Sequence, residues 1–109
     1  MHDLIMSANK SLHLLRGAID KRYEVAAERA EAERDYRTTL GREMAEQRVN
    51  GMAATALYDY CRGLPDIAEK RMRRDILLAQ EDHLTELIYY YRTTIRLLEG
   101  QINAERKSL

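Results

Sequence analysis

Residues 84–102 read LTELIYYYRTTIRLLEGQI, and their apolar pattern decides the fold. Steps of four and three residues alternate without a miss along six apolar positions, which are Leu84, Ile88, Tyr91, Ile95, Leu98 and Ile102. This spacing is typical of an α-helix that packs lengthwise against another helix. The same register reaches back to Leu77, but it also places the charged residues Arg74 and Glu81 on core positions.

A second long helix is expected over about residues 3–50. Its apolar or small residues again have helical spacing, and they are Ala8, Leu12, Leu15, Ile19, Tyr23, Ala26 and Ala30. The steps approximate an eleven-residue repeat more closely than a heptad, which predicts a nearly straight helix. Residues 28–37 read ERAEAERDYR, a strong helix-forming stretch in which Glu33 and Arg37 form an i,i+4 pair.

A short connector separates the two long helices. Asn50-Gly51 ends the first helix, because both residues tolerate the left-handed conformation of a helix end. Residues 52–63 form a brief helix, and Pro65 opens a long helix over 65–107. The sequence therefore predicts an all-α chain in one domain, 1–109, in which two long helices form an antiparallel coiled-coil hairpin.

The apolar face of the last helix is wider than a two-stranded seam needs, because Leu87, Tyr90 and Leu97 flank it. A two-helix hairpin of this size buries little surface per residue. We therefore expect a homodimer with a four-helix bundle where two hairpins overlap. The residues predicted at this oligomer interface are Leu77, Leu84, Ile88, Tyr91, Ile95, Leu98 and Ile102, with Leu12, Leu15 and Ile19 from the first helix.

Composition and charge exclude several classes of protein. The 109 residues carry 18 basic and 18 acidic side chains, so neither a generic polyanion binder nor an acidic DNA mimic is expected. One cysteine cannot form an internal disulfide or a cysteine-based zinc site. No apolar run approaches a membrane span and no secretion signal is evident, so the cytoplasm is the expected compartment.

No catalytic constellation stands out in the sequence. The three histidines, His2, His13 and His83, lack the i,i+4 spacing of a helical metal site, and no Glu-x-x-His pattern is present. Cys61 has no neighbouring base and is interpreted as a small buried side chain. The chain is therefore expected to be a non-enzyme without a metal or another cofactor.

Two groups of residues are candidates for contact with a partner. Exposed tyrosines are common interface anchors, and the candidates are Tyr58, Tyr60, Tyr89 and Tyr90; covering a neighbouring helix is an equally good interpretation. The basic run at 70–74, with Arg71, Arg73 and Arg74, could contact phosphates or an acidic protein surface. Carboxylates surround this run, however, and favour a solvated, locally paired helix face.

The second half of the chain resembles a family of small uncharacterised helical proteins of bacteriophages and prophages. The resemblance rests on LYDYCRG at 57–63, on IAEKR at 67–71 with Arg74-Asp75, and on RLLE at 96–99 with Gln101-Ile102. It implies a phage-encoded protein in a bacterial host cell and supplies no catalytic residues.

Together these features suggest an accessory protein that binds a host or phage protein, such as an inhibitor of a host nuclease or of a defence complex of the CRISPR type. Two alternatives remain. One is a nucleic-acid-associated accessory of phage recombination or replication, and the other is a structural coiled-coil spacer. No membrane partner is expected.

Overall fold

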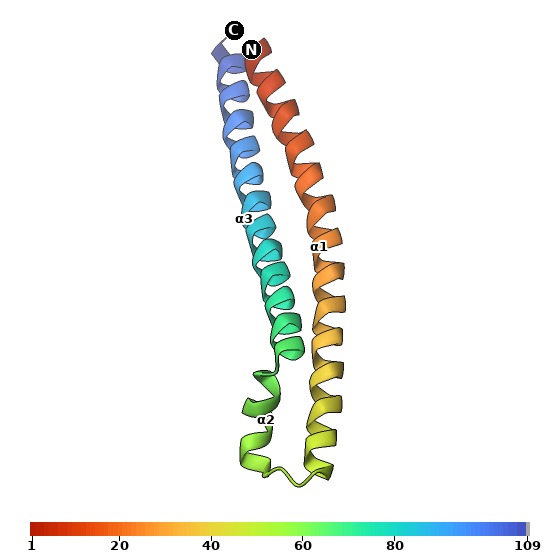
Figure 1. Ribbon diagram of the computed structural model, residues 1–109. Coiled ribbons are helices and arrows are strands. Elements are labelled where there is room, and N and C mark those ends of the chain that lie inside the picture. The colour runs from red at the N-terminus through yellow and green to blue at the C-terminus, as the bar shows by residue number, and fades with distance from the viewer. Residues whose placement is uncertain (109) are drawn as a thin grey trace. The chain divides into compact units, whose positions relative to one another are not determined.

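A computed structural model describes residues 1–108 and places them almost entirely in three helices (Figure 1). These are α1, His2–Val49; α2, Ala54–Arg62; and α3, Pro65–Ser108. The expected ranges of 3–50, 52–63 and 65–107 differ from these bounds by at most two residues at any end, and the start at Pro65 is identical. No strand occurs in the described part of the chain, so the all-α prediction is confirmed.

Two compact units divide the chain. Unit 1 joins Met1–Glu24 with the part of α3 that begins at Glu81, and unit 2 is Val25–Gln80. Both contain a stretch of α1 and a stretch of α3, and unit 2 also contains α2.

The first helix ends as its sequence predicts. Gly51 has a φ of +96°, a left-handed conformation that a residue with a Cβ rarely adopts. Its N–H donates to the carbonyl of Arg48 at 3.1 Å, and the N–H of Met52 donates to the carbonyl of Gln47 at 3.0 Å. This pair of bonds is a Schellman motif, and it gives partners to carbonyls that the end of α1 would otherwise leave unpaired.

The junction between α2 and α3 is also determined by residues that are adjacent in the sequence. The N–H of Gly63 donates to the carbonyls of Asp59 and Tyr60, which closes α2. Pro65 is the first residue of α3, a position at which its missing N–H costs no hydrogen bond. The chain can therefore begin the second long helix within two residues of the end of α2.

In unit 1 the beginning of α1 lies beside the end of α3, and the two helices run in opposite directions (Figure 1). The amino group of Met1 lies 3.0 Å from a carboxylate oxygen of Glu105, and Arg22 donates through Nε to Thr85 Oγ1 at 2.8 Å. The least exposed α1 side chains of this unit form an uninterrupted heptad stripe, made of Leu4, Ala8, Ser11, Leu15, Ala18 and Arg22. The antiparallel hairpin is thus present within unit 1.

In unit 1, the packing stripe of the first helix does not follow the expected eleven-residue repeat. Leu12, Ile19 and Tyr23 were assigned to its packing stripe, but they are 50%, 39% and 79% exposed. The seam follows heptad spacing, and several of its positions hold small or charged residues such as Ser11 and Arg22. A pattern built from apolar residues alone therefore includes some seam residues and some exposed neighbours such as Leu12 and Ile19. Their combined spacing resembles a repeat longer than seven residues.

Unit 2 has its own small core, to which all three helices contribute. Its buried residues are Tyr36 and Leu40 of α1, Leu57 and Cys61 of α2, and Ile67 of α3, with Met44, Met52 and Leu64 packed against them. Leu57 and Cys61 are one turn apart, so α2 presents a single apolar edge to this core. Cys61 is fully buried, as its interpretation as a small apolar side chain requires.

Charged residues occupy core positions in both units, as the backward extension of the heptad indicates. In unit 1 Glu81 is 8% exposed, and one of its carboxylate oxygens lies 3.7 Å from a guanidinium nitrogen of Arg22. In unit 2 Arg74 forms an ion pair with Glu33 at 3.2 Å, and its guanidinium carbon lies 4.6 Å from the ring centroid of Tyr36. The heptad of α3 therefore continues through these charges, because α1 supplies a partner for each.

Candidate functional site

A second heptad stripe on α3 lies outside the seam in unit 1. We call it the outer stripe, and its members are His83, Leu87, Tyr90, Thr94, Leu97 and Gln101, which alternate steps of four and three. Tyr90 and Leu97 are 62% and 65% exposed, and Leu87 is half-buried. The outer stripe contains no charged residue, although a third of the chain is charged. The end of α3 thus has two packing faces, of which α1 contacts the seam.

The beginning of α1 also has an exposed apolar stripe, which we call the α1 stripe. Ile5, Leu12 and Ile19 recur every seven residues and are 43%, 50% and 39% exposed. Each follows a seam residue by one position, whereas Leu87, Thr94 and Gln101 of the outer stripe precede seam residues by one. In an antiparallel helix pair these positions lie on opposite sides of the seam, so unit 1 has an apolar stripe on each side.

The residues predicted at a subunit interface fall into two groups. Two α1 residues, Leu12 and Ile19, are exposed on the α1 stripe. The other predicted residues are buried or half-buried within the single chain, and they are Leu77, Leu84, Ile88, Tyr91, Ile95, Leu98, Ile102 and Leu15. Dimerisation and its interface stay predictions.

The four candidate tyrosines are all exposed. Tyr58 and Tyr60 of α2 are 45% and 49% exposed, and Tyr89 and Tyr90 of α3 are 70% and 62% exposed. The guanidinium carbon of Arg62 lies 5.1 Å from the centroid of the Tyr58 ring, and that contact holds the ring against α2. Tyr90 makes an edge-to-face contact with the seam residue Tyr91, with ring centroids 5.6 Å apart.

Two of the four cations in the basic run at 70–74, Lys70 and Arg74, form ion pairs with carboxylates. Lys70 lies 3.4 Å from Asp66, and Arg74 contacts both Glu33 and Asp75. Arg71 is half-buried and Arg73 is exposed. The structure thus does not gather Arg71, Arg73 and Arg74 into one unopposed positive patch, which phosphate binding would favour.

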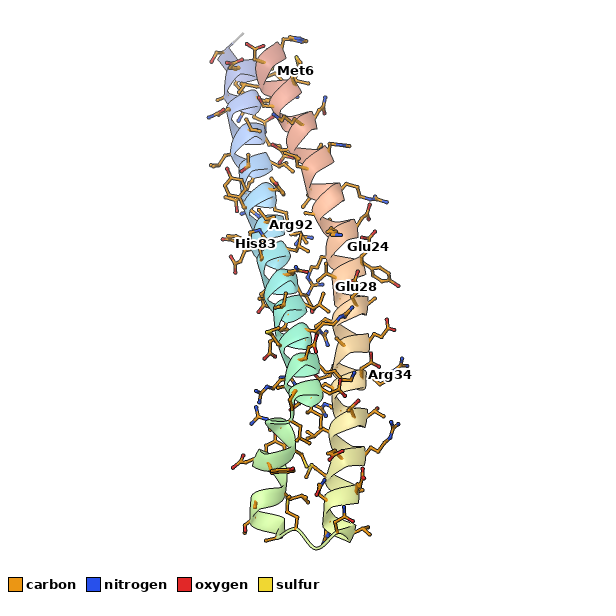
Figure 2. All side chains as sticks on the ribbon, in the orientation of Figure 1. Met6, Glu24, Glu28, Arg34, His83 and Arg92 are labelled. Carbon is orange, nitrogen blue, oxygen red and sulfur yellow. The ribbon has the colours of Figure 1, made fainter. Side chains whose placement is uncertain are left out.

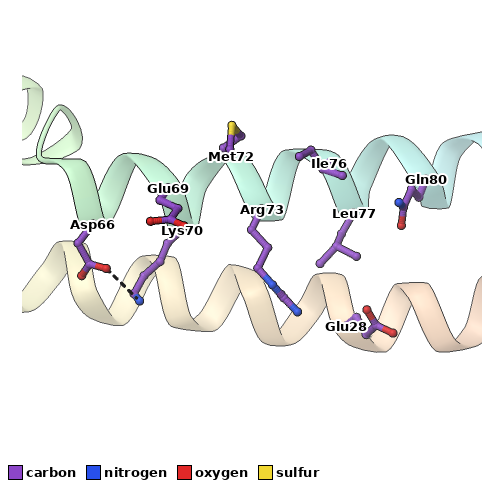
Figure 3. Close-up of a pocket in the computed structure, with 9 residues that line it drawn as sticks. All are labelled: Glu28, Asp66, Glu69, Lys70, Met72, Arg73, Ile76, Leu77 and Gln80. Atoms are coloured by element: carbon purple, nitrogen blue, oxygen red, sulfur yellow. Dashed lines mark ion pairs between the residues drawn. The ribbon is translucent and has the colours of Figure 1, made fainter.

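Unit 2 contains an open groove of about 650 Å³ beside this run (Figure 3). Leu77 and Arg73 point toward α1, whereas Met72 and Ile76 lie on the side of α3 that faces away from it. Glu28 of α1 also lines the groove. Three carboxylates and two cations line this open groove, so its charges largely balance.

Other reactive side chains are dispersed. Burial raises the pKa of the Cys61 thiol, which makes it a poor nucleophile. All three histidines are exposed, and Figure 2 shows His83 on α3. Among residues 1–108 no group of three or more histidine, cysteine or carboxylate side chains is placed to hold a metal ion.

Within the same residues, no helix combines the length and the apolar character that crossing a bilayer requires.

Sequence reasoning assigned Leu12 and Ile19 of the α1 stripe to the packing seam, and it missed the partners of the charges on core positions. Leu4, Ala8 and Leu15 alone would have set the heptad phase of α1, and that phase puts Ile5, Leu12 and Ile19 beside the seam. It also puts Arg22 on a core position, where a carboxylate on the other helix is required.

No protein-family model matches this sequence, and comparisons with curated proteins and with solved structures gave no match. The resemblance to phage and prophage proteins therefore stays a prediction.

Proposed function

We propose that this chain is a non-enzymatic accessory protein, encoded by a phage or prophage, that acts by binding another protein. The α1 stripe carries the proposal. Three aliphatic side chains seven residues apart are 39% to 50% exposed, on a helix whose adjacent face already packs against α3.

The spacing of the α1 stripe indicates the kind of partner. Residues seven apart on one helix face fit an amphipathic helix that presents its own apolar residues at the same period. Arg16 lies between Leu12 and Ile19 on this face, and an ion pair with Asp20 at 3.5 Å leaves the face without strong net charge. A partner with an apolar, weakly charged helix is therefore favoured over a strongly acidic or basic one.

The phage resemblance suggests host nucleases and defence complexes as the first partners to test, with inhibition as the result of binding. A nucleic-acid-associated role receives less support, because Lys70 and Arg74 already contact carboxylates.

Comparative capture tests the proposal. The wild-type chain, Leu12→Lys and Ile19→Lys are immobilised, and bound proteins from phage-infected cells and from lysogenic cells are compared by mass spectrometry. Met6→Lys is the matched control, since Met6 is 57% exposed on the same helix but outside the stripe (Figure 2). We expect a protein that binds the wild-type chain and the control and is lost from both stripe variants.

That protein is then purified and titrated with each variant. Each lysine places a charge in an apolar contact, so the affinity should fall at least about tenfold for Leu12→Lys and Ile19→Lys but not for Met6→Lys. Equal affinity for all four proteins would refute the α1 stripe as the binding face. A captured nuclease would be assayed for loss of activity with the wild-type chain.

A further inference from the structure

The composition of the outer stripe of α3 is typical of a helix face that packs against another protein surface. Over the 19 residues from His83 to Gln101, every charged residue of α3 lies off this stripe, although solvent-facing helix positions normally carry charge. Leu97 and Tyr90 are nevertheless more than half exposed in the single chain. Leu14 of α1 is 41% exposed and precedes a seam residue, so it flanks the seam on the same side and widens the apolar face.

The order of residues along the outer stripe is self-complementary. Read in either direction, it begins with a polar residue, continues with a leucine and reaches Tyr90 or Thr94 at its centre. Antiparallel coiled coils pair the two kinds of core position with each other. That rule sets Leu87 against the partner's Leu97, Tyr90 against the partner's Thr94, and His83 against the partner's Gln101. Leucine therefore meets leucine in two layers, and hydrogen-bonding side chains meet each other in the remaining layers.

We propose that a second copy of this chain covers the outer stripe, with the two α3 helices antiparallel about a twofold axis between Tyr90 and Thr94. Such an interface is isologous, so each contact occurs twice. Apolar layers lie on both sides of the axis, and the hydrogen-bonding side chains His83 and Gln101 lie at the edges, where water can reach them.

The flank of this pairing accounts for a glycine that the single chain leaves unexplained. Gly100 lies within α3, where glycine costs about 1 kcal/mol relative to alanine, and a Cβ on it would have no atom within 4 Å. In the proposed pairing Gly100 faces the partner's Glu86, and the missing side chain leaves room for that glutamate. No like charges oppose each other along this flank, since Thr93 meets the partner's Thr93.

Sedimentation equilibrium of the full chain over a wide concentration range tests the pairing. We expect a dimer for the wild type, and at least a 100-fold weaker association for Leu97→Glu, because each dimer would bury two carboxylates against leucine. Tyr89→Glu is the matched control, since Tyr89 is 70% exposed on the same helix but outside the outer stripe. Circular dichroism establishes that each variant keeps its helices.

A charge rescue tests the antiparallel register. Leu87→Lys alone should also weaken the dimer, whereas Leu87→Lys combined with Leu97→Glu should restore it, because the two positions meet across the axis. In a parallel pair each position would meet its own copy, and the combination would not restore association. A monomeric wild type, an intact Leu97→Glu dimer or a failed rescue would each overturn the proposal.

The tests of the two proposals are separable. Leu97→Glu lies off the α1 stripe and should leave capture of the foreign protein intact, and Leu12→Lys should leave the dimer intact.

Discussion

At the residue scale, unit 1 pairs a buried carboxylate, Glu81, with a guanidinium, Arg22, whose side chain is 42% exposed. Glu81 is 8% exposed on the α3 seam between Leu77 and Leu84, and the desolvation of its carboxylate offsets much of what the ion pair with Arg22 contributes. We predict that replacing both residues, Arg22→Leu with Glu81→Leu, raises the free energy of unfolding by about 1 kcal/mol. Thermal unfolding followed by circular dichroism measures the change.

Removing only one residue of the pair should lower the free energy of unfolding. Glu81→Ala deletes one side of the pair and leaves a gap in the seam, so it should lower the free energy of unfolding by about 1–3 kcal/mol. A double variant that is less stable than the wild type would show that the charges themselves hold the seam together.

Glu33 of unit 2 makes a pH-dependent contribution to the free energy of unfolding. Arg37 donates through Nε to its carboxylate at 2.6 Å, and this bond lowers the pKa of Glu33 from 4.5. Because the unfolded carboxyl group binds its proton at higher pH than the folded one, the contribution is complete above pH 4.5 and is lost as the pH falls through the lowered folded pKa.

We therefore predict that Glu33→Gln destabilises the chain at neutral pH and that the difference from wild type shrinks at about pH 3. Urea unfolding of both proteins at the two pH values measures this. A difference of equal size at both would show that the charge of Glu33 does not contribute.

At the element scale, α1 contains a glycine whose replacement should be favourable. Gly41 lies within the helix, is exposed, and has no atom within 4 Å of the position a Cβ would take. Gly41→Ala should raise the free energy of unfolding by about 0.8–1 kcal/mol, since alanine loses less conformational freedom in a helix. Urea unfolding at neutral pH tests it.

Gly51→Ala is the contrasting variant for the same measurement. Gly51 has a φ of +96°, so alanine should lower the stability there by about 1 kcal/mol. If Gly41→Ala and Gly51→Ala change the free energy of unfolding alike, the positive φ at the end of α1 does not explain why residue 51 is a glycine.

The helices themselves were predictable from sequence, whereas the face that each one buries was predictable only for α3. Six apolar residues fixed the seam of α3, and Asn50-Gly51 and Pro65 fixed the ends of helices through backbone geometry. The seam of α1 was not found because its polar positions, Arg22 among them, become favourable only opposite particular residues of α3. Propensity and period contain no information about a partner that is 63 residues away along the chain, as Thr85 is from Arg22.

At the scale of the whole molecule, self-association and partner binding would use opposite sides of the same helix pair. A dimer through the outer stripe leaves both copies of the α1 stripe exposed, so each dimer should bind two partner molecules. Light scattering of the complex with the purified partner would give two chains with two partners. One partner per dimer would show that the α1 stripe is blocked by the second copy.

Dimerisation should also make thermal stability depend on concentration. A ligand that binds only the folded state shifts unfolding by mass action, and a second copy is such a ligand. The melting temperature of the wild type should therefore rise with chain concentration, whereas that of Leu97→Glu should not. Identical curves for the two proteins would contradict the dimer.

The charges within the seam of unit 1 also determine how the two helices align lengthwise. Leucine, isoleucine and alanine layers look much alike every seven residues, so apolar contacts alone would tolerate a slip of α1 by two turns. Such a slip would carry Arg22 away from Glu81 and set it beside Ile88, where a guanidinium finds no carboxylate. The Arg22–Glu81 ion pair thereby fixes the register of the two helices, because it favours one alignment among several that have similar apolar contacts.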